Sequence, residues 1–153
     1  MGTQKDKLKT VQLEILREIH AICEKHRLTQ YTIGVTLIGA VRHNGQIPWD
    51  DDIDIAMPRE CYEQLKKQVN SHHTKKFFFQ DATTEANYPL PFGKVRRNRT
   101  KYLDQHSEPY NIHKGIFVDV FPLDALSTDS HLEFFLRYHL VQFFFRRLLK
   151  WNK

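Results

Sequence analysis

The 153-residue sequence has few cysteines, few glycines and prolines, and no long uncharged apolar segment. Its two cysteines, Cys23 and Cys61, lack metal-site spacing and are too few for a disulfide framework, so we expect small buried thiols in a reducing compartment. Because no run approaches the about 18 apolar residues of a membrane-spanning helix, we expect none. The first ten residues, MGTQKDKLKT, show no apolar core or cleavage site, so we expect no secretory signal and a cytoplasmic location.

The composition is otherwise that of an ordinary globular protein, with 41% hydrophobic and 27% charged residues. A chain of this length suits one domain with a sizeable core. The formal net charge of +5 favours anionic partners such as nucleotides, phosphates or anionic lipid, with a solvated basic surface as the alternative. We expect no nucleic acid partner.

Apolar spacing predicts helices and strands in mixed order. A spacing of three or four residues predicts helices over 7–27, 36–42 and 59–69, and from about residue 130 to the end. Alternating or short apolar runs predict strands over 31–34, 52–57, 77–79, 92–96 and 115–121. We expect Pro58 in the first turn of a helix, Pro122 at the end of the last strand, and a hairpin partner for 92–96 near 101–103. This order indicates an α/β or α+β domain.

Four aspartates crowd into the segment IPWDDDIDIAMP, which runs from Ile47 to Pro58. Asp52 and Asp54 lie two apart on the predicted strand, so their side chains share one face about 7 Å apart. Asp119 is an acid in the middle of the apolar strand GIFVDVF, where a charge must be paired or bind a metal. Three such carboxylates suit Mg²⁺ or Mn²⁺, and ions bridged in this way serve displacement at phosphorus.

Other acidic motifs share parts of this pattern. An EF-hand loop starting at Asp50 would need glycine and glutamate where Ile55 and Cys61 stand, so we exclude it. A nucleophilic aspartate of the phosphatase type would follow an unbroken apolar strand. Here Pro-Trp-Asp-Asp precedes Asp52, which argues against such a nucleophile. A D-x-D glycosyltransferase that holds a metal on a nucleotide sugar stays open, as does an acidic strand end that merely faces water.

A glycine-bearing turn precedes the acidic strand. The segment IGVTLIGAVRH leads from a strand into a helix with Gly34 at the bend. Backbone N–H groups at a helix start favour anions, Thr36 offers a hydroxyl and Arg42 a guanidinium. We expect this turn to contact phosphate.

These segments together resemble one family. TLIGAVRHNGQIPWDDDIDIAMPRECYEQL, then NYPLPFGKVRRNRT and GIFVDVFPLD, are similar in kind and order to the blocks of the LicD family, which includes the fukutin-type proteins. The resemblance implies a nucleotidyltransferase-like mixed sheet flanked by helices. It implies transfer of a phospho-alcohol, typically phosphocholine from CDP-choline, to a sugar of teichoic acid, lipopolysaccharide or capsule, with release of CMP. By the same resemblance Asp52, Asp54 and Asp119 bind metal, and Asp50 is expected as a further metal ligand or as an acid that contacts the ligands.

The sequence also departs from the family pattern. Where the family usually has Gly-Gly-Thr or Ser-Gly-Thr, this chain has Gly34-Val35-Thr36, and a β-branched residue resists positive φ. Residues 1–153 are expected to form a single LicD-type domain that lacks C-terminal residues of longer members. A catalytically impaired nucleotide-binding module is therefore a further alternative.

Several residues are assigned to the expected reaction. Arg42, Lys94 and Arg96 are expected to bind phosphate oxygens, and the general base is either an aspartate or His43. Trp49 is a packing residue or a stacking platform. An aromatic cage for choline has candidates in Tyr88, Phe92 and Tyr110. The tail HLEFFLRYHLVQFFFRRLLKWNK either packs on protein or forms a peripheral contact with the inner face of the membrane, where lipid-linked acceptors would lie.

Overall fold

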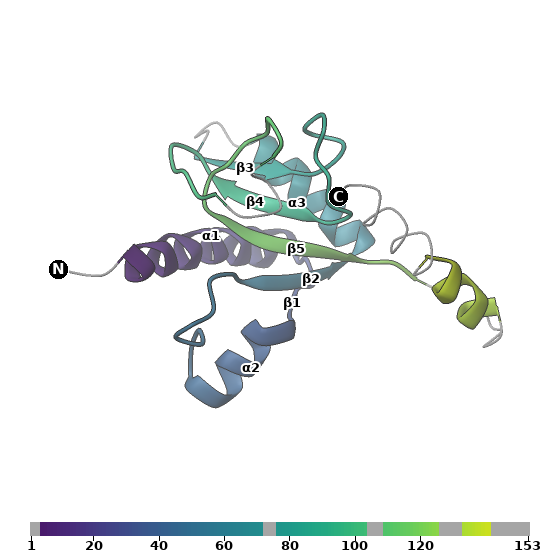
Figure 1. The fold of residues 1–153 in the computed structure, drawn as a ribbon, viewed down its shortest axis with the longest axis horizontal. Coiled ribbons are helices and arrows are strands. Elements are labelled where there is room, and N and C mark those ends of the chain that lie inside the picture. Colours follow the sequence, from purple (N-terminus) through teal and green to yellow (C-terminus); the bar gives the residue numbers. More distant parts are fainter. Residues whose placement is uncertain (1–3, 72–75, 104–108, 126–132, 142–153) are drawn as a thin grey trace. The chain divides into compact units, whose positions relative to one another are not determined.

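The computed structural model describes residues 4–71, 76–103, 109–125 and 133–141. Contacts divide the chain into two units, Met1–Leu123 and Asp124–Lys153, and each is described by itself. The first unit contains a five-stranded mixed sheet flanked by helices, which confirms the predicted α/β class (Figure 1).

The first unit alternates helices and strands along the chain. In order, these are α1 (Gln4–His26), β1 (Tyr31–Thr32), α2 (Gly34–His43), β2 (Asp54–Pro58), α3 (Arg59–Ser71), β3 (Phe77–Gln80), β4 (Gly93–Arg97) and β5 (Phe117–Leu123). The strands lie in the order β1-β2-β5-β4-β3. The β2–β5 pair is parallel and the other three pairs are antiparallel.

One face of the sheet packs against α1 and α3, which lie side by side behind it (Figure 1). The apolar stripes of these helices meet alternate strand residues there. The core contains Ile15, Ile19, Ile22, Tyr62, Leu65, Val69, Ile53, Ile55, Met57, Phe79, Val95, Val118 and Val120. Burying each large apolar side chain contributes about 1.5–3 kcal/mol. Because strand side chains alternate, the intervening residues, Asp119 among them, project from the other face.

Both cysteines are free thiols, as expected, and Cys23 lies in this core. Burial, together with the neighbouring Cys61, raises the pKa of the Cys23 thiol to about 11. Cys23 is therefore a protonated packing residue at neutral pH.

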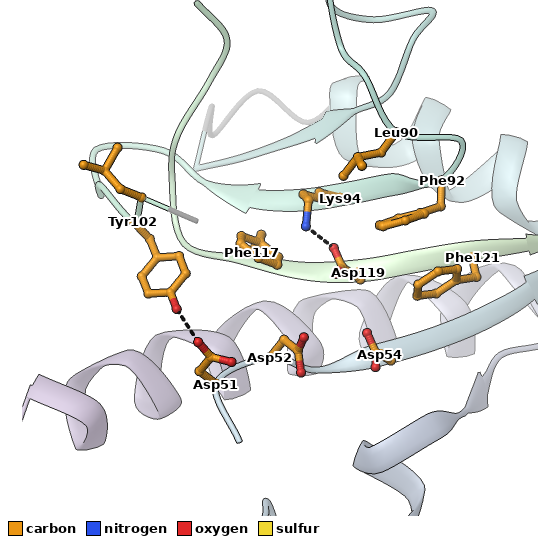
Figure 2. Close-up of a pocket in the computed structure, with 11 residues that line it drawn as sticks. Asp51, Asp52, Asp54, Leu90, Phe92, Lys94, Tyr102, Phe117, Asp119 and Phe121 are labelled. Atoms are coloured by element: carbon orange, nitrogen blue, oxygen red, sulfur yellow. Dashed lines mark hydrogen bonds and ion pairs between the residues drawn. The ribbon is translucent and has the colours of Figure 1, made fainter. Parts of the chain in front are cut away.

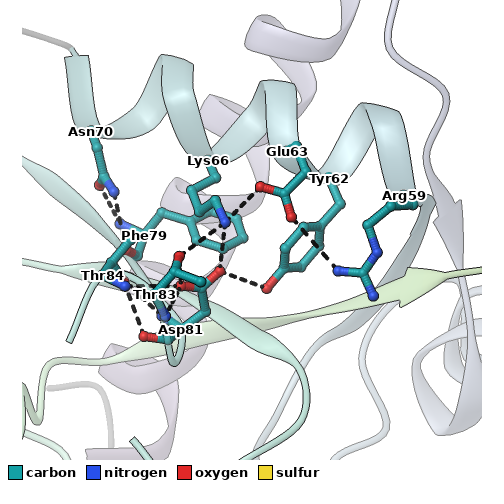
Figure 3. Close-up of polar contacts among 9 residues, drawn as sticks. All are labelled: Arg59, Tyr62, Glu63, Lys66, Asn70, Phe79, Asp81, Thr83 and Thr84. Carbon is teal, nitrogen blue, oxygen red and sulfur yellow. Dashed lines mark hydrogen bonds and ion pairs between the residues drawn. The ribbon is translucent and has the colours of Figure 1, made fainter. Parts of the chain in front are cut away.

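Polar side chains fasten α3 to the edge strand β3 (Figure 3). Asn70 accepts from the Phe79 N–H at 2.8 Å and donates to the Phe79 carbonyl at 3.2 Å, as a neighbouring strand would. After β3, Asp81 accepts from Tyr62 and Lys66 of α3 and from the N–H groups of the turn that follows. These bonds fix the edge of the sheet beside β4.

Two strand predictions are wrong. Pro122 does not end β5, because the strand continues to Leu123. The pairing of β5 with β4 ends at Val120. No described β4 residue therefore pairs with Pro122, and the N–H group that proline lacks leaves no β4 carbonyl without a hydrogen bond. Residues 101–103 form no strand; β4 lies between β3 and β5, and the Tyr102 N–H donates to the Lys114 carbonyl at 2.7 Å instead.

The helix boundaries differ slightly from the predictions. Pro58 is the last residue of β2, and α3 begins at Arg59. The strand predicted over 52–57 starts at Asp54, although the Asp119 N–H still donates to the Ile53 carbonyl at 2.9 Å.

In the second unit, residues 133–141 are helical and belong to the predicted C-terminal helix. The remainder of that prediction, residues 130–132 and 142–153, lies outside the described residues. Among the helices of the described residues, none combines the length and apolar character needed to cross a bilayer.

Candidate active site

Three carboxylates converge on the sheet face that α1 and α3 leave uncovered. Asp54 of β2 and Asp119 of β5 are register neighbours, and Asp52 lies two residues before Asp54. One carboxylate oxygen from each lies within 4.8 Å of those of the other two. Figure 2 shows all three side chains pointing toward the same space. The parallel β2–β5 pairing therefore brings together acids that are 65 or more positions apart in the sequence.

Repulsion and burial act on these carboxylates together. The pKa of Asp52 rises to about 6, first through burial and then through Asp54, Asp50 and Asp51. Burial and Asp119 raise the pKa of Asp54 to about 6. Burial also raises the pKa of Asp119 to about 6, although Lys94 opposes the rise. At neutral pH the site therefore holds negative charges that a cation would stabilise.

Lys94 is the basic side chain placed among these acids. It is 3% exposed, and its ammonium donates to Asp119 Oδ1 at 2.6 Å (Figure 2). The same Nζ lies 3.4 Å from the centre of the Phe117 ring, a cation–π contact that holds it in the sheet face. One lysine against three carboxylates leaves the acids in excess. An oxygen-only donor set of this kind fits Mg²⁺ or Mn²⁺.

The carboxylates and Lys94 line a cleft of about 600 Å³. Its other walls are apolar and aromatic, with Phe92 stacked on Phe121 at 4.3 Å between ring centres and Phe117 beside Lys94. Of the cage candidates, Phe92 lines the cleft, whereas Tyr88 and Tyr110 do not. Phe117 and Phe121 were missed, although a period of two around Asp119 places both on its face of β5.

The start of α2 lies against Asp54. Gly34 has φ +57°, and a Cβ there would be 3.3 Å from Asp54 Oδ2. The Asp54 N–H donates to the Thr36 hydroxyl at 2.9 Å. Gly34 and Thr36 thus position the acid directly. Val35 does not share the positive φ and is 44% exposed, so its branched side chain does not strain this turn.

The irregular segment before β2 is held by α1 and by Tyr102. Gln12, 1% exposed, donates to the Asp51 carbonyl at 2.7 Å and accepts from Gln46. Lys9 donates to the Ile47 carbonyl at 2.8 Å, and the Tyr102 hydroxyl donates to Asp51 Oδ2 at 2.7 Å. Sequence reasoning missed these residues. The one available signal was a glutamine on the apolar face of α1.

Five expected site residues are not part of the cleft lining, namely Gly34, Thr36, Arg42, Arg96 and Asp50, although one Asp50 carboxylate oxygen lies within 4.8 Å of oxygens of Asp51 and Asp52. Arg96 is fully buried, donates to Gln80 and to the Gly115 carbonyl, and joins β4 to its neighbours. Arg42 is exposed in the last turn of α2, about 12 Å along the helix axis from Gly34. Asp50 does not line the cleft, but its charge raises the pKa values of Asp52 and Asp54.

His43 and Trp49, which were also given candidate roles, lie outside the cleft as well. His43 ends α2 and meets the ring of Trp49 edge-on at 6.1 Å between ring centres. Trp49 is 73% exposed and forms no part of the aromatic wall.

The mixed sheet and the acid cluster define an α/β domain with a candidate metal site, and comparison with known proteins names its class. Residues 29–146 match the family model described as "LicD/FKTN/FKRP, nucleotidyltransferase domain". This match covers more than half of the chain, so the chain belongs to the LicD family.

Similar curated proteins come from bacteria. Lipopolysaccharide cholinephosphotransferase LicD of Haemophilus influenzae is 33% identical over 124 residues, which is 80% of this chain and 45% of that protein. Uncharacterised proteins of Rickettsia prowazekii and Rickettsia typhi are 38% identical over 47 residues, 31% of this chain and 18% and 15% of theirs. The chain therefore spans less than half the length of these relatives.

Proposed function

We propose that this chain takes part in metal-dependent transfer of phosphocholine from a CDP-choline-type donor to a cell-surface glycan, with release of CMP. The observation that carries the proposal is the convergence of Asp52, Asp54 and Asp119 in an aromatic cleft. Membership of the LicD family and similarity to a lipopolysaccharide cholinephosphotransferase support the choice of reaction.

Asp52, Asp54 and Asp119 are the residues that would hold Mg²⁺ or Mn²⁺. Such an ion supplies positive charge to diphosphate oxygens as charge builds on the leaving group. Lys94 holds the Asp119 carboxylate through its 2.6 Å contact and adds a second positive charge. The start of α2 at Gly34 fixes Asp54 from the opposite side.

The transfer forms one bond at phosphorus and breaks another. The acceptor hydroxyl oxygen bonds to the phosphocholine phosphorus while the bond from that phosphorus to the CMP oxygen breaks. The hydroxyl proton passes to a carboxylate of the cleft, because His43 lies at the other end of α2. The aromatic wall of Phe92 and Phe121 offers π faces that attract the quaternary ammonium of choline, whereas the Phe117 ring already contacts the Lys94 ammonium.

The acceptor belongs to the same proposal. Lipopolysaccharide is the named acceptor of the Haemophilus relative, and teichoic acid or capsule are the other glycans we expect. A lipid-linked acceptor would bring the protein to the inner face of the membrane. There the C-terminal helix, described over residues 133–141, would form a peripheral contact.

Calorimetry on this chain tests the donor assignment. CDP-choline, CDP-ribitol and UDP-glucose are titrated with and without MgCl₂. We expect CDP-choline to bind most tightly and to need the metal. Preference for UDP-glucose would indicate the glycosyltransferase alternative. Metal-independent binding, or none, would indicate an impaired module. A turnover assay with labelled CDP-choline on this chain and a longer relative then measures whether CMP is released.

A further inference from the structure

A second depression adjoins the aspartate cleft. It has a volume of about 820 Å³ and shares three lining residues with the cleft, namely Asp51, Tyr102 and Leu103. The Tyr102 hydroxyl bonds to Asp51 Oδ2, so this pair marks the boundary between the two spaces. We call the second depression the lysine groove, after Lys5, Lys7 and Lys101, which line it.

The lysine groove is basic, in contrast to the cleft. Lys5 and Lys7 come from the first turn of α1, and Lys101 from the segment beside Tyr102. Among the described residues none of these lysines forms an ion pair with a carboxylate. Lys9, by contrast, is occupied by the Ile47 carbonyl. The groove therefore presents three ammonium groups that are available to a ligand.

Besides the lysines and the polar residues Gln4, Asp51 and Tyr102, the walls of the groove are apolar. Leu8 and Val11 of α1 line it together with Ile116, which precedes β5. A surface with an apolar floor and a few cationic groups suits a sugar ring that carries an anionic substituent. Lysine binds phosphate as a point charge and also attracts carboxylates.

We propose that the lysine groove binds the acceptor glycan through an anionic group, a phosphate or a carboxylate, close to the reacting hydroxyl. This inference rests on the proposed function. Displacement at phosphorus requires the attacking and leaving oxygens to lie roughly in line. An acceptor therefore needs its own approach to the phosphorus, separate from the path of the nucleotide. The groove supplies that approach through its border with the cleft at Asp51, Tyr102 and Leu103.

Paired charge reversals test the groove. The Lys7→Glu/Lys101→Glu double variant reverses the charge of two of the three groove lysines, and the Lys25→Glu/Lys67→Glu variant makes the same change of net charge elsewhere. Lys25 is exposed on α1 about 27 Å from Lys7 along the helix axis, and Lys67 is exposed on α3. Calorimetry measures binding of maltotriose 6-phosphate, a uronic acid trisaccharide and plain maltotriose. CDP-choline with MgCl₂ is titrated separately.

We expect both anionic trisaccharides or one of them to bind more tightly than maltotriose, and the preferred one identifies the anion. The groove variant should weaken that binding about tenfold, and the control less than about threefold. Neither double variant should alter the affinity for CDP-choline. Equal weakening by both variants, or no weakening by the groove variant, would overturn the proposal.

Two further results separate this inference from others. Binding to phosphatidylglycerol vesicles that depends on Lys7 and Lys101, without binding of either anionic sugar, would overturn the assignment to a glycan. If the donor does not bind while the sugar binding depends on the two lysines, the groove is supported and the proposed donor chemistry fails.

Discussion

At the scale of single residues, charge is arranged in one row across the sheet. Asp54 of β2 is the register neighbour of Asp119 of β5, which is in turn the neighbour of Lys94 of β4. The lysine offsets one carboxylate and leaves the acids in excess. Asp119 was foreseeable, because an acid inside an apolar strand needs a partner. Its contact with Lys94 was not, because it depends on the register of two strands.

Replacing Asp54 by asparagine should change metal affinity and stability in opposite ways. The variant loses a carboxylate ligand, so we expect Mg²⁺ affinity to fall at least about 10- to 100-fold in calorimetry. It also removes a repelling charge, so the metal-free variant should melt at a higher temperature than the parent at neutral pH.

Asp50→Asn is the matched control for this experiment, since Asp50 does not line the cleft. We expect its effect on Mg²⁺ affinity to be several-fold smaller. An equal loss of affinity would place Asp50 among the ligands.

Gln12→Met should weaken the site from a distance. Methionine keeps the shape of the side chain but cannot donate to the Asp51 carbonyl, which loses its 2.7 Å bond. We expect about 1–3 kcal/mol lower stability in urea unfolding and weaker Mg²⁺ binding, because Asp52 follows directly. Leu13→Met, at an exposed position of the same helix, should leave both unchanged. Normal Mg²⁺ affinity in Gln12→Met would show that Gln12 serves folding alone.

At the scale of secondary structure, elements with a clear period were predictable and their ends were not. The α1 stripe and the alternation in β2 and β5 gave helix and strand correctly. The predicted end of β5 at Pro122 was wrong because a proline is tolerated in this strand once its pairing with β4 has ended. The position at which that pairing ends cannot be recognised from the local sequence. The hairpin expected near residues 101–103 failed for a related reason, because β4 obtains both neighbours from distant segments.

The start of α2 is the element boundary on which Asp54 depends most. Alanine at Gly34 must adopt φ +57° and place a Cβ 3.3 Å from Asp54 Oδ2. We expect Gly34→Ala to cost about 1 kcal/mol or more in urea unfolding and to lower Mg²⁺ affinity. Gly45 has an open environment and no positive φ, so Gly45→Ala should be neutral or stabilise by about 0.4–1 kcal/mol. Similar behaviour of the two variants would contradict this role of Gly34.

At the scale of the whole molecule, the class of fold followed from the order of elements, but the sheet order did not. Pairing β2 with β5 joins residues separated by three intervening elements, and that pairing creates the acid cluster. The cleft and the lysine groove likewise depend on side chains from α1, β2, β4, β5 and the loops between them. The three acids could be named from the sequence, whereas the residues that hold them required the tertiary structure.

The acid cluster should also govern how stability responds to pH. The folded pKa values of Asp52, Asp54 and Asp119 are about 6, above the ordinary 3.8. The folded chain therefore binds protons that the unfolded chain releases between these values. Their stabilising contribution is complete below about pH 4 and is lost as the pH rises through 6. His113 acts in the opposite direction near this range, because burial lowers its pKa.

Comparison with Asp54→Asn isolates the contribution of Asp54, since both proteins retain Asp52, Asp119 and His113. Without metal, we expect the melting temperature of the parent to fall relative to that of the variant between about pH 5 and pH 7.5. At about pH 7.5, saturating Mg²⁺ should give the parent the higher melting temperature. An ion present at 100 times its dissociation constant adds about 2.7 kcal/mol to the stability of the folded protein that binds it. At about pH 5 the carboxylates are largely protonated, so Mg²⁺ should have much less effect. A Mg²⁺ shift of equal size at both pH values would mean that the ion binds elsewhere.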